Sequence, residues 1–419
     1  MSPAPSRAGR RLLVAGGVLA AGVLLVGTAV VVPRPFGSGV RTVAPTGVAA
    51  PLPGTATTPA QRLALVQNVL DRRGTAVRRD DATAYAGTQV ARAEAPLFAR
   101  LKVLPLVRWA YTPSSPTTST ADLVVLPVRL TTRLAGETAD ATSYETITLR
   151  RTGSRWLVVS EVTRGERAAL WDLGTLRVVR GARSLVIGID APASTLRAYA
   201  ATSDRVVPQV TAVWGKDWSR YAVVIVPRTV SQLARALGRT ASSLDGYAAV
   251  TTAEGVPDAT HHVAERVWVN TPAMAGLSSI GRQVVMRHEM THVATYAPEH
   301  PDAPLWLVEG VAEWMGYRGS GIPLDVATGD LLDDVRRGRV PQPLPADDAF
   351  AGDGVDVAYE SAHLACALVV SRHDARTLVA LYRAVAIDGD DVATAYEAVT
   401  GDPLSALEDA WRARARRLA

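Results

Sequence analysis

The sequence His288-Glu289-Met290-Thr291-His292 holds the residues best suited to chemistry. On a helix, histidines four residues apart lie on one face about one turn apart, so both imidazoles can bind one metal ion. Glu289 directly follows the first histidine, and it is placed to take a proton from a metal-activated water rather than to bind the metal. The motif predicts a metal site with its own general base, against the alternative of a histidine pair that only packs in a core.

A third ligand is available in the segment 304–314, which is apolar apart from two carboxylates four residues apart. Because an uncompensated buried carboxylate is costly, we expect a cation to face this helix. Glu309 is predicted to complete the ligand set, and Glu313 to accept the free ring N–H of a ligand histidine. Gly310 is expected to let this helix approach the HExxH helix closely. Two His and one Glu predict Zn²⁺ with one coordination position open.

Other ligand schemes fit less well. A metzincin would need Gly at position 295 and His or Asp at position 298, and the chain has Thr295 and Pro298 there. The loop between the two helices also holds Glu299, His300 and Asp302, which we expect to lie at the surface.

The paired motifs His288-Glu289-x-x-His292 and Trp306-Leu307-x-Glu309-Gly310-x-Ala312-Glu313 resemble the gluzincin branch of zinc metallopeptidases. They are most similar to the peptidase MA-like, HExxH-containing extracellular proteins of high-GC bacteria, over about residues 265–385. The resemblance implies zinc-dependent hydrolysis of peptide bonds, with Glu309 as the third zinc ligand and Glu313 behind the ligands. The gap of 16 residues between His292 and Glu309 is shorter than in the aminopeptidase-type members, and no GxMEN-like exopeptidase motif precedes it. The substrate class therefore stays open.

The segment 356–362 is similar to the Tyr-Glu-Lys-Gly segment of aminopeptidase-like gluzincins, although only its tyrosine and glutamate match. The resemblance implies that Tyr359 stabilises the developing oxyanion, and a tyrosine that only packs in the core is an equal alternative. The strand expected at 267–270 precedes the HExxH helix, and we expect it to be the edge strand to which a peptide substrate adds. The sequence identifies no further substrate-binding residue.

The elements that must position these residues span 170–419. Strands are predicted at 176–179, 184–187, 222–226 and 266–270, a helix at 196–213, and mostly helices after 279. This pattern predicts a zincin-like metallopeptidase domain with a mostly helical C-terminal half.

Residues 60–165 read as a helix followed by strands at 121–130, 144–150 and 156–159, the last two joined by a Gly153-Ser154 turn. Helices followed by an antiparallel sheet resemble the NTF2-like cone fold. The first histidine of the chain is His261, so a histidine-based acid/base site inside this module is excluded. A spacer or binding module is expected, and the chain as a whole is predicted to be α+β.

Residues 12–32 are apolar and uncharged, and as a helix they would span about 31 Å, close to the hydrocarbon thickness of a bilayer. Three arginines precede them, which favours a cytoplasmic tail at 1–11 and extracytoplasmic domains. A cleaved signal peptide, and hence a secreted protein, is the alternative. Residues 33–59 are rich in Pro, Gly and Thr and predict a flexible linker.

Composition excludes other classes. The chain has 419 residues and a formal net charge of only +5, with aromatic residues at 5%, so a nucleic-acid partner is not expected. The single cysteine, Cys366, excludes an intramolecular disulfide framework and a cysteine-bound metal cluster.

The leading hypothesis is therefore a membrane-anchored, extracytoplasmic zinc peptidase acting on peptides or proteins. The alternative is a non-catalytic cell-surface binding protein with a structural zinc and a ligand-binding NTF2-like module. The sequence does not indicate an oligomeric state.

Overall fold

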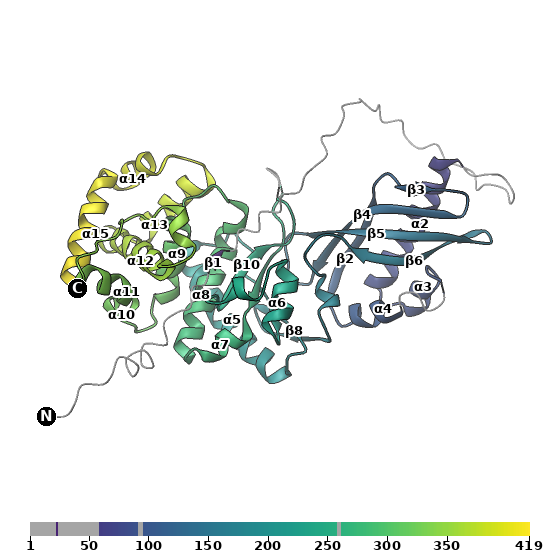
Figure 1. The fold of residues 1–419 in the computed structure, drawn as a ribbon, viewed down its shortest axis with the longest axis horizontal. Coiled ribbons are helices and arrows are strands. Elements are labelled where there is room, and N and C mark those ends of the chain that lie inside the picture. Colours follow the sequence, from purple (N-terminus) through teal and green to yellow (C-terminus); the bar gives the residue numbers. More distant parts are fainter. Residues whose placement is uncertain (1–21, 24–57, 91–94, 258–260) are drawn as a thin grey trace.

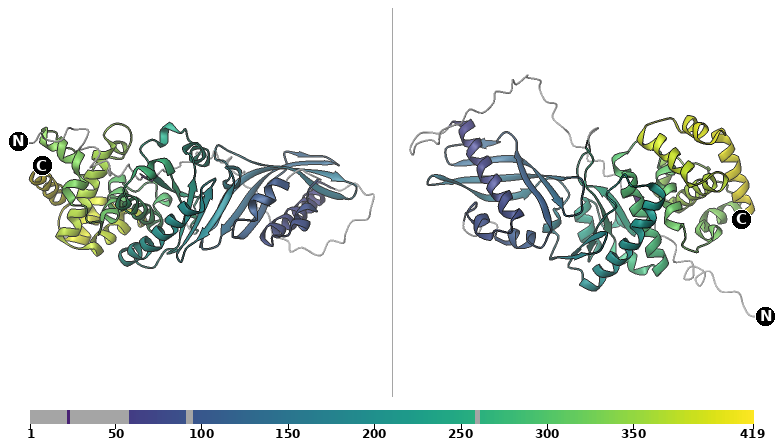
Figure 2. Two further views of the ribbon diagram at one scale, coloured as in Figure 1. Left: turned by 90° about the horizontal axis from the view of Figure 1, so that it is seen from below. Right: turned by 180° about the vertical axis from the view of Figure 1, so that it is seen from behind.

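The computed structural model describes residues 22–23, 58–90, 95–257 and 261–419. These residues form an elongated molecule with three parts: an N-terminal module, a central sheet and a C-terminal group of helices (Figures 1 and 2). The predicted α+β class is confirmed. The predicted tail and nearly all of the predicted transmembrane segment and linker lie outside the described residues. Among the described helices, none is long and apolar enough to cross a membrane.

The N-terminal module packs helices against an antiparallel sheet. The strand order is β2-β4-β5-β6, with the short β3 paired to β4. The elements are α2 (Pro59–Arg78), α3 (Ala82–Ala86), α4 (Ala95–Leu101), β2 (Leu106–Pro113), β3 (Thr118–Ser119), β4 (Leu123–Leu134), β5 (Ala141–Thr152) and β6 (Arg155–Thr163).

Helix α2 lies close to β2, and a glycine makes this possible. A Cβ atom on Gly74 would stand 2.7 Å from the carbonyl oxygen of Trp109, which is closer than atoms can pack. Beside this contact, Arg73 forms a buried ion pair with Glu161 at 2.9 Å, and the Tyr111 hydroxyl donates to Glu161 at 2.8 Å. The space between helix and sheet is thus partly filled by a polar network.

The central sheet has the order β1-β10-β11-β9-β8-β7. Strands β8, β9 and β11 run parallel, whereas β7 is antiparallel to β8 and β10 is antiparallel to β11; β1 runs parallel to β10. The strands are β1 (Gly22–Val23), β7 (Leu176–Arg180), β8 (Ser184–Ile189), β9 (Ala222–Pro227), β10 (Ala249–Ala253) and β11 (Glu265–Val269). The expectation that 267–270 forms the edge strand is wrong, because β11 lies between β9 and β10. Strand β10 lies outside β11, and on its other side it pairs, among the described strands, only with the two-residue β1.

Helices cover both faces of this sheet. Val267 and Val269 of β11 share a core with α5 (Ala193–Trp214) and α8 (Ser279–Thr295). Trp268, which points the other way, packs in the core that contains α6 (Val230–Leu237). Because side chains alternate along a strand, the two faces of the sheet have separate partners.

The C-terminal part is predominantly helical, as predicted. Its helices are α9 (Leu305–Tyr317), α10 (Leu324–Ala327), α11 (Gly329–Arg336), α12 (Val355–Arg372), α13 (Ala375–Tyr382), α14 (Val392–Thr400) and α15 (Leu404–Leu418), and the short α7 (Thr271–Gly276) precedes α8. Short turns complete the described elements: 3-10 turns at Leu170–Asp172, Ser242–Leu244, Ala297–Glu299 and Asp347–Phe350, and a π turn at Arg383–Ile387.

Two glycines set the spacing around α9. A Cβ atom on Gly310 would stand 2.6 Å from the carbonyl oxygen of Ala362 and 2.8 Å from the sulfur of Cys366, both on α12. A Cβ atom on Gly316 would stand 3.2 Å from the carbonyl oxygen of Val284 on α8. The expectation for Gly310 is therefore wrong in its partner: Gly310 brings α9 against α12, and Gly316 brings α9 against the HExxH helix.

The N-terminal module and the central sheet are joined by a continuous core. Leu170, Leu173 and Leu176 are buried in one cluster with residues of both parts. Polar contacts reinforce the junction, because Thr142 N–H donates to the Glu254 carbonyl at 2.7 Å and Arg266 pairs with Glu137 at 2.8 Å.

Candidate metal centre

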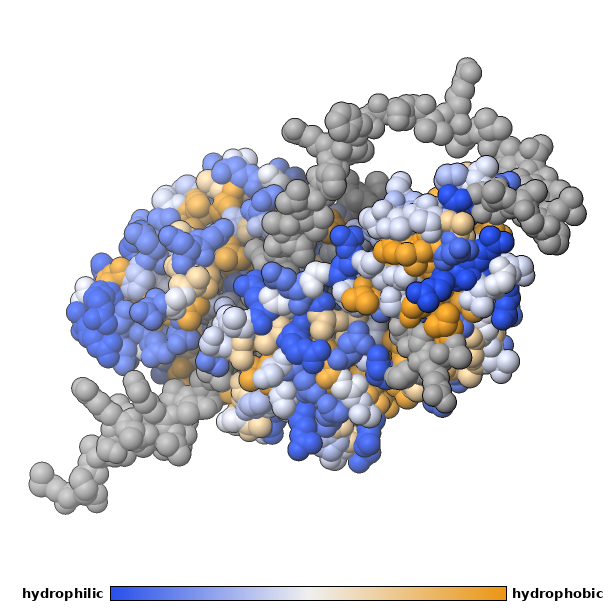
Figure 3. Space-filling model, turned by 45° about the vertical axis from the view of Figure 1, so that its right-hand side comes forward, coloured by the Kyte–Doolittle hydropathy of each residue, from blue (hydrophilic) through white to orange (hydrophobic). Residues whose placement is uncertain are grey.

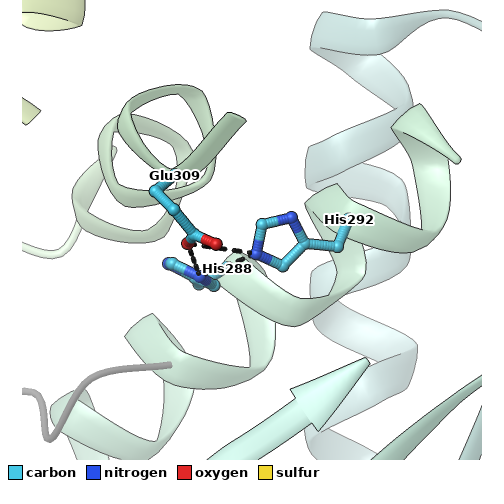
Figure 4. Close-up of side chains that lie close together, drawn as sticks. All are labelled: His288, His292 and Glu309. Atoms are coloured by element: carbon cyan, nitrogen blue, oxygen red, sulfur yellow. Dashed lines mark hydrogen bonds and ion pairs between the residues drawn. The ribbon is translucent and has the colours of Figure 1, made fainter. Parts of the chain in front are cut away.

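His288, His292 and Glu309 come together between α8 and α9 (Figure 4). The two histidine Nε2 atoms are 2.9 Å apart. The Oε2 atom of Glu309 lies 3.3 Å from His288 Nε2 and 3.5 Å from His292 Nε2. All three side chains are buried, and among the described residues they are the one group whose ligand atoms could hold a metal ion.

The donor set fits a metal ion. Tetrahedral ligands at about 2.0–2.1 Å from a zinc ion stand roughly 3.3 Å from one another, close to the observed separations. The electrostatics also call for positive charge: burial opposes protonation of His288, but the carboxylates of Glu309 and Glu313 raise its pKa to about 10. A buried site that attracts a proton this strongly is suited to a cation.

The local sequence explains why these side chains are buried together. Helix α8 begins after Ser278, whose hydroxyl accepts the backbone N–H of Gly281, and it ends at Tyr296 in the left-handed conformation. Every residue from 284 to 295 is buried, because one face of this helix lies on the sheet and another meets α9. Helix α9 is apolar around Glu309, and its carboxylate is buried.

Glu313 lies behind the first histidine. Its Oε1 atom is 2.9 Å from Nδ1 of His288, so the carboxylate can accept the ring N–H and leave Nε2 free to bind a cation. The sequence predicts this role for Glu313. Burial disfavours the ionised form of Glu309, yet the two histidines lower its pKa to about 2, so the side chain stays ionised.

Glu289 is fully buried and held from the sheet side. The Thr251 hydroxyl lies 2.6 Å from Oε2 of Glu289 and can donate a hydrogen bond to it, whereas Oε1 has no hydrogen-bond partner among the described residues. Burial raises the pKa of Glu289 to about 7, against the opposing effects of His288 and Thr251. One oxygen is thus anchored and the other is left for another molecule.

Tyr359 lies beside the centre on α12. Its ring centroid is 6.5 Å from that of His288, and its other face is packed edge-on against Phe350 at 5.2 Å. Burial, with Glu309 nearby, raises the pKa of Tyr359 well above its usual value, so its hydroxyl keeps its proton and can donate.

Sequence reasoning missed Thr251, Tyr247 and His363. Thr251 lies on β10, a five-residue strand that the sequence did not predict. Tyr247 precedes that strand, and its pKa is raised by burial and by the Glu309 carboxylate. His363 is one turn after Tyr359 and stacks on the Tyr317 ring at 4.9 Å, and burial lowers its pKa to about 4. The spacing of His363 from Tyr359 was the one signal that could have found it.

The loop after α8 is partly different from the expectation. Glu299 was predicted to lie at the surface, but only 5% of its side chain is exposed. It contacts His262 Nδ1 at 2.6 Å and accepts the Val263 N–H at 2.9 Å. The Glu299 side chain thus holds the segment before β11 in place. These contacts explain why Glu299 is buried although it lies away from the histidine pair.

No protein-family model matches the chain, and no curated protein sequence matches it. Among solved structures, a function-unknown protein from Mycobacterium tuberculosis is similar at 12% identity and a TM-score of 0.22. The match covers 26% of this chain and 73% of that protein. A likeness this small does not bear on the metal centre.

Proposed function

We propose that this protein is a zinc-dependent peptidase of the gluzincin type, in which His288, His292 and Glu309 hold the metal ion. One observation carries the proposal. Three buried side chains bring their ligand atoms together, and the nearby Glu289 carboxylate is held by Thr251 instead of joining them. The finer fold assignments belong to the same proposal: a zincin-like domain from residue 170 onwards and an NTF2-like module at 60–165.

The chain's own groups divide the work. A bound Zn²⁺ would supply Lewis-acid activation of a water molecule and of the peptide carbonyl. Glu289, with Oε2 held by Thr251, takes a proton from the attacking water at Oε1 and passes it to the leaving amine. Tyr359 donates its hydroxyl proton as a hydrogen bond to the developing oxyanion. Glu313 holds His288 in the tautomer that presents Nε2 to the metal.

The alternative is a structural zinc in a non-catalytic surface protein whose NTF2-like module binds a ligand. A structural site is closed by four protein ligands, whereas here three are found among the described residues. It also has no need of a buried carboxylate such as Glu289, whose burial is costly. Both features support catalysis.

The cellular setting is proposed from the sequence alone. Residues 12–32 would anchor the chain in the membrane, with the peptidase outside the cytoplasm, or would be removed as a signal peptide; in either case Gly22 and Val23 would leave their place beside β10. The substrate is proposed to be a peptide or protein.

The test compares the full chain with its Glu289→Gln variant. Both proteins should bind one zinc ion, measured by elemental analysis, and only the unsubstituted protein should cleave a proteome-derived peptide library. Full hydrolysis by the variant would rule out the role of Glu289. Zinc binding without any hydrolysis by the unsubstituted protein would favour the structural alternative.

A further inference from the structure

A cavity of about 260 Å³ lies where the N-terminal module meets the central sheet. One wall comes from strands β4 to β6, and the other comes from the end of β10, from β11 and from α6. The connecting segment 164–171 lies between them. Its volume is close to the lower end of the range for ligand pockets, about 300–1,000 Å³, so it suits one or two side chains rather than a large cofactor.

The cavity is separate from the metal centre. Trp268 and Glu254, which line it, point to the face of the sheet that α6 covers. Helix α8, with the two histidines, lies on the opposite face. Neither metal ligands nor Glu289 line the cavity.

The charges in the floor are already paired. Arg167 donates to both carboxylate oxygens of Glu254, at 3.1 and 3.2 Å, and Trp268 Nε1 donates to the same side chain at 3.1 Å. Arg266 pairs with Glu137 at 2.8 Å. Two guanidinium groups thus face two carboxylates, and the floor does not call for a charged occupant.

The walls and rim are mixed in character. Leu170, Trp171 and Ala168 contribute apolar surface to the walls, whereas threonine hydroxyls and the exposed Arg164 and Glu166 also line the cavity. At the rim, Tyr144 is 46% exposed and Val256 is 60% exposed, an unusual exposure for such side chains. Figure 3 shows other apolar patches on the forward part of the molecule, which carries the N-terminal module, within a largely hydrophilic surface. An occupant that covers Tyr144 and Val256 would remove apolar surface from water, which is favourable. The rim therefore favours an apolar or aromatic occupant.

Strand β10 connects the cavity to the catalytic side. Ala253 lines the cavity, and Thr251, two residues earlier on the same strand, contacts Glu289. Two residues of extended strand span about 7 Å. The outer edge of β10 is suited to an extended segment: Gly22 and Val23 of the chain itself pair there with Val250 and Thr251, and a peptide substrate would take their place.

We infer that this cavity binds an apolar or aromatic side chain of an extended peptide substrate that lies along β10 and passes the metal centre. The inference rests on the proposed peptidase function, and it adds a specificity pocket to which the N-terminal module contributes a wall. The bound side chain belongs to a residue about two to five positions from the one beside Thr251.

The test measures binding without turnover. Acetylated and amidated decapeptides of alanine and serine, with Phe, Lys or Glu at one position, are titrated by calorimetry into the zinc-loaded full chain carrying Glu289→Gln. We expect the best Phe peptide to bind about tenfold more tightly than its Lys or Glu counterparts, as burial of one aromatic side chain predicts. Equal affinities at every position overturn the inference.

Three further variants in the same background locate the preference. Ala168→Trp fills the cavity and should abolish the advantage of Phe. Val256→Ser alters an exposed rim residue that the fold does not need, and it should reduce the advantage about threefold. Val162→Trp adds an indole at a position that is 59% exposed and outside the cavity, and it should change nothing. A Phe advantage that survives both cavity variants places the contact elsewhere and overturns the inference.

Two measurements separate this inference from the proposed function. Selective binding that follows the cavity variants, in a protein that never hydrolyses peptides, refutes the peptidase and leaves the pocket in place. Binding of N-acetyl-phenylalanine amide as tight as that of the decapeptides shows a small-molecule pocket instead, and refutes the peptide occupant.

Discussion

The hydroxyl of Thr251 lies 2.6 Å from Oε2 of Glu289 and ties strand β10 to the helix that carries both histidines. The hydroxyl is fully buried, and its other near neighbour is the backbone oxygen of Glu289 at 3.2 Å. The sheet therefore fixes the orientation of the carboxylate, which the helix alone would leave free to rotate.

Replacing Thr251 with valine should slow peptide hydrolysis and leave metal binding intact. The valine keeps the volume but removes the donor, so Glu289 loses the contact that orients it, and we expect a drop in kcat of about 10–100-fold. Thr251→Ser, which keeps the hydroxyl, should retain most of the activity. Steady-state kinetics with zinc analysis checks both variants, and a Val variant as active as the Ser variant would show that the contact is not needed.

Replacing the two carboxylates of α9 should weaken metal binding to different degrees. Glu313→Gln removes a carboxylate that supports His288, and we expect zinc affinity to fall about 10–100-fold. Glu309→Ala removes a direct ligand and should lower the affinity further. Glu397→Gln, on an exposed face of α14, is the matched control. Competition with a chelator measures all three, and an unchanged affinity for Glu309→Ala would contradict the ligand assignment.

A methyl group on Gly310 should destabilise the protein. Its Cβ atom would collide with the backbone of Ala362, so α9 and α12 must separate, at a cost of about 1–3 kcal/mol in the free energy of unfolding. Zinc affinity should fall too, because Glu309 is the preceding residue on α9. In contrast, Gly329→Ala meets no atom within 4 Å and should be neutral or stabilising by about 0.4–1 kcal/mol. Urea denaturation of the two variants provides the comparison.

Glu145 should make stability depend on pH. Burial, with Glu161 nearby, raises its pKa to about 8, whereas a glutamate in an unfolded chain ionises near about 4.3. Between these values the folded state holds a proton that the unfolded state has released, so the free energy of unfolding falls as the pH rises through this window. Glu145→Gln removes that loss, and we expect it to stabilise the protein by about 1–3 kcal/mol at about pH 8 relative to its effect at about pH 4.

Urea denaturation at both pH values measures the difference. A Glu145 variant that parallels the unsubstituted protein at both pH values would refute the burial argument.

The cluster of His288, His292 and Glu309 was largely predictable from the sequence because its signals are local. The spacing of His288 and His292 places them on one helical face, and a carboxylate pair in an apolar helix indicates that something positive faces Glu309. Thr251 was not predictable in the same way. Its strand has only five residues, Ala249–Ala253, and nothing in their order shows that they pair outside β11.

Contacts between distant segments were also out of reach. The sequence places Gly310 on the helix after the HExxH helix, so α8 was the natural partner to expect. The true neighbour, α12, begins more than forty residues later, and packing of the whole C-terminal group decides the contact. The cavity next to Tyr144 and Val256 has the same origin, since its walls come from segments spread between residues 132 and 268.

The leucines at 170, 173 and 176 sit in one apolar cluster with both neighbouring parts. As a consequence, the N-terminal module is not an independent domain that an unrelated domain could simply replace. Separating the polypeptide between the two sheets would expose apolar surface on each half. A replacement module would need an apolar surface that matches the exposed one.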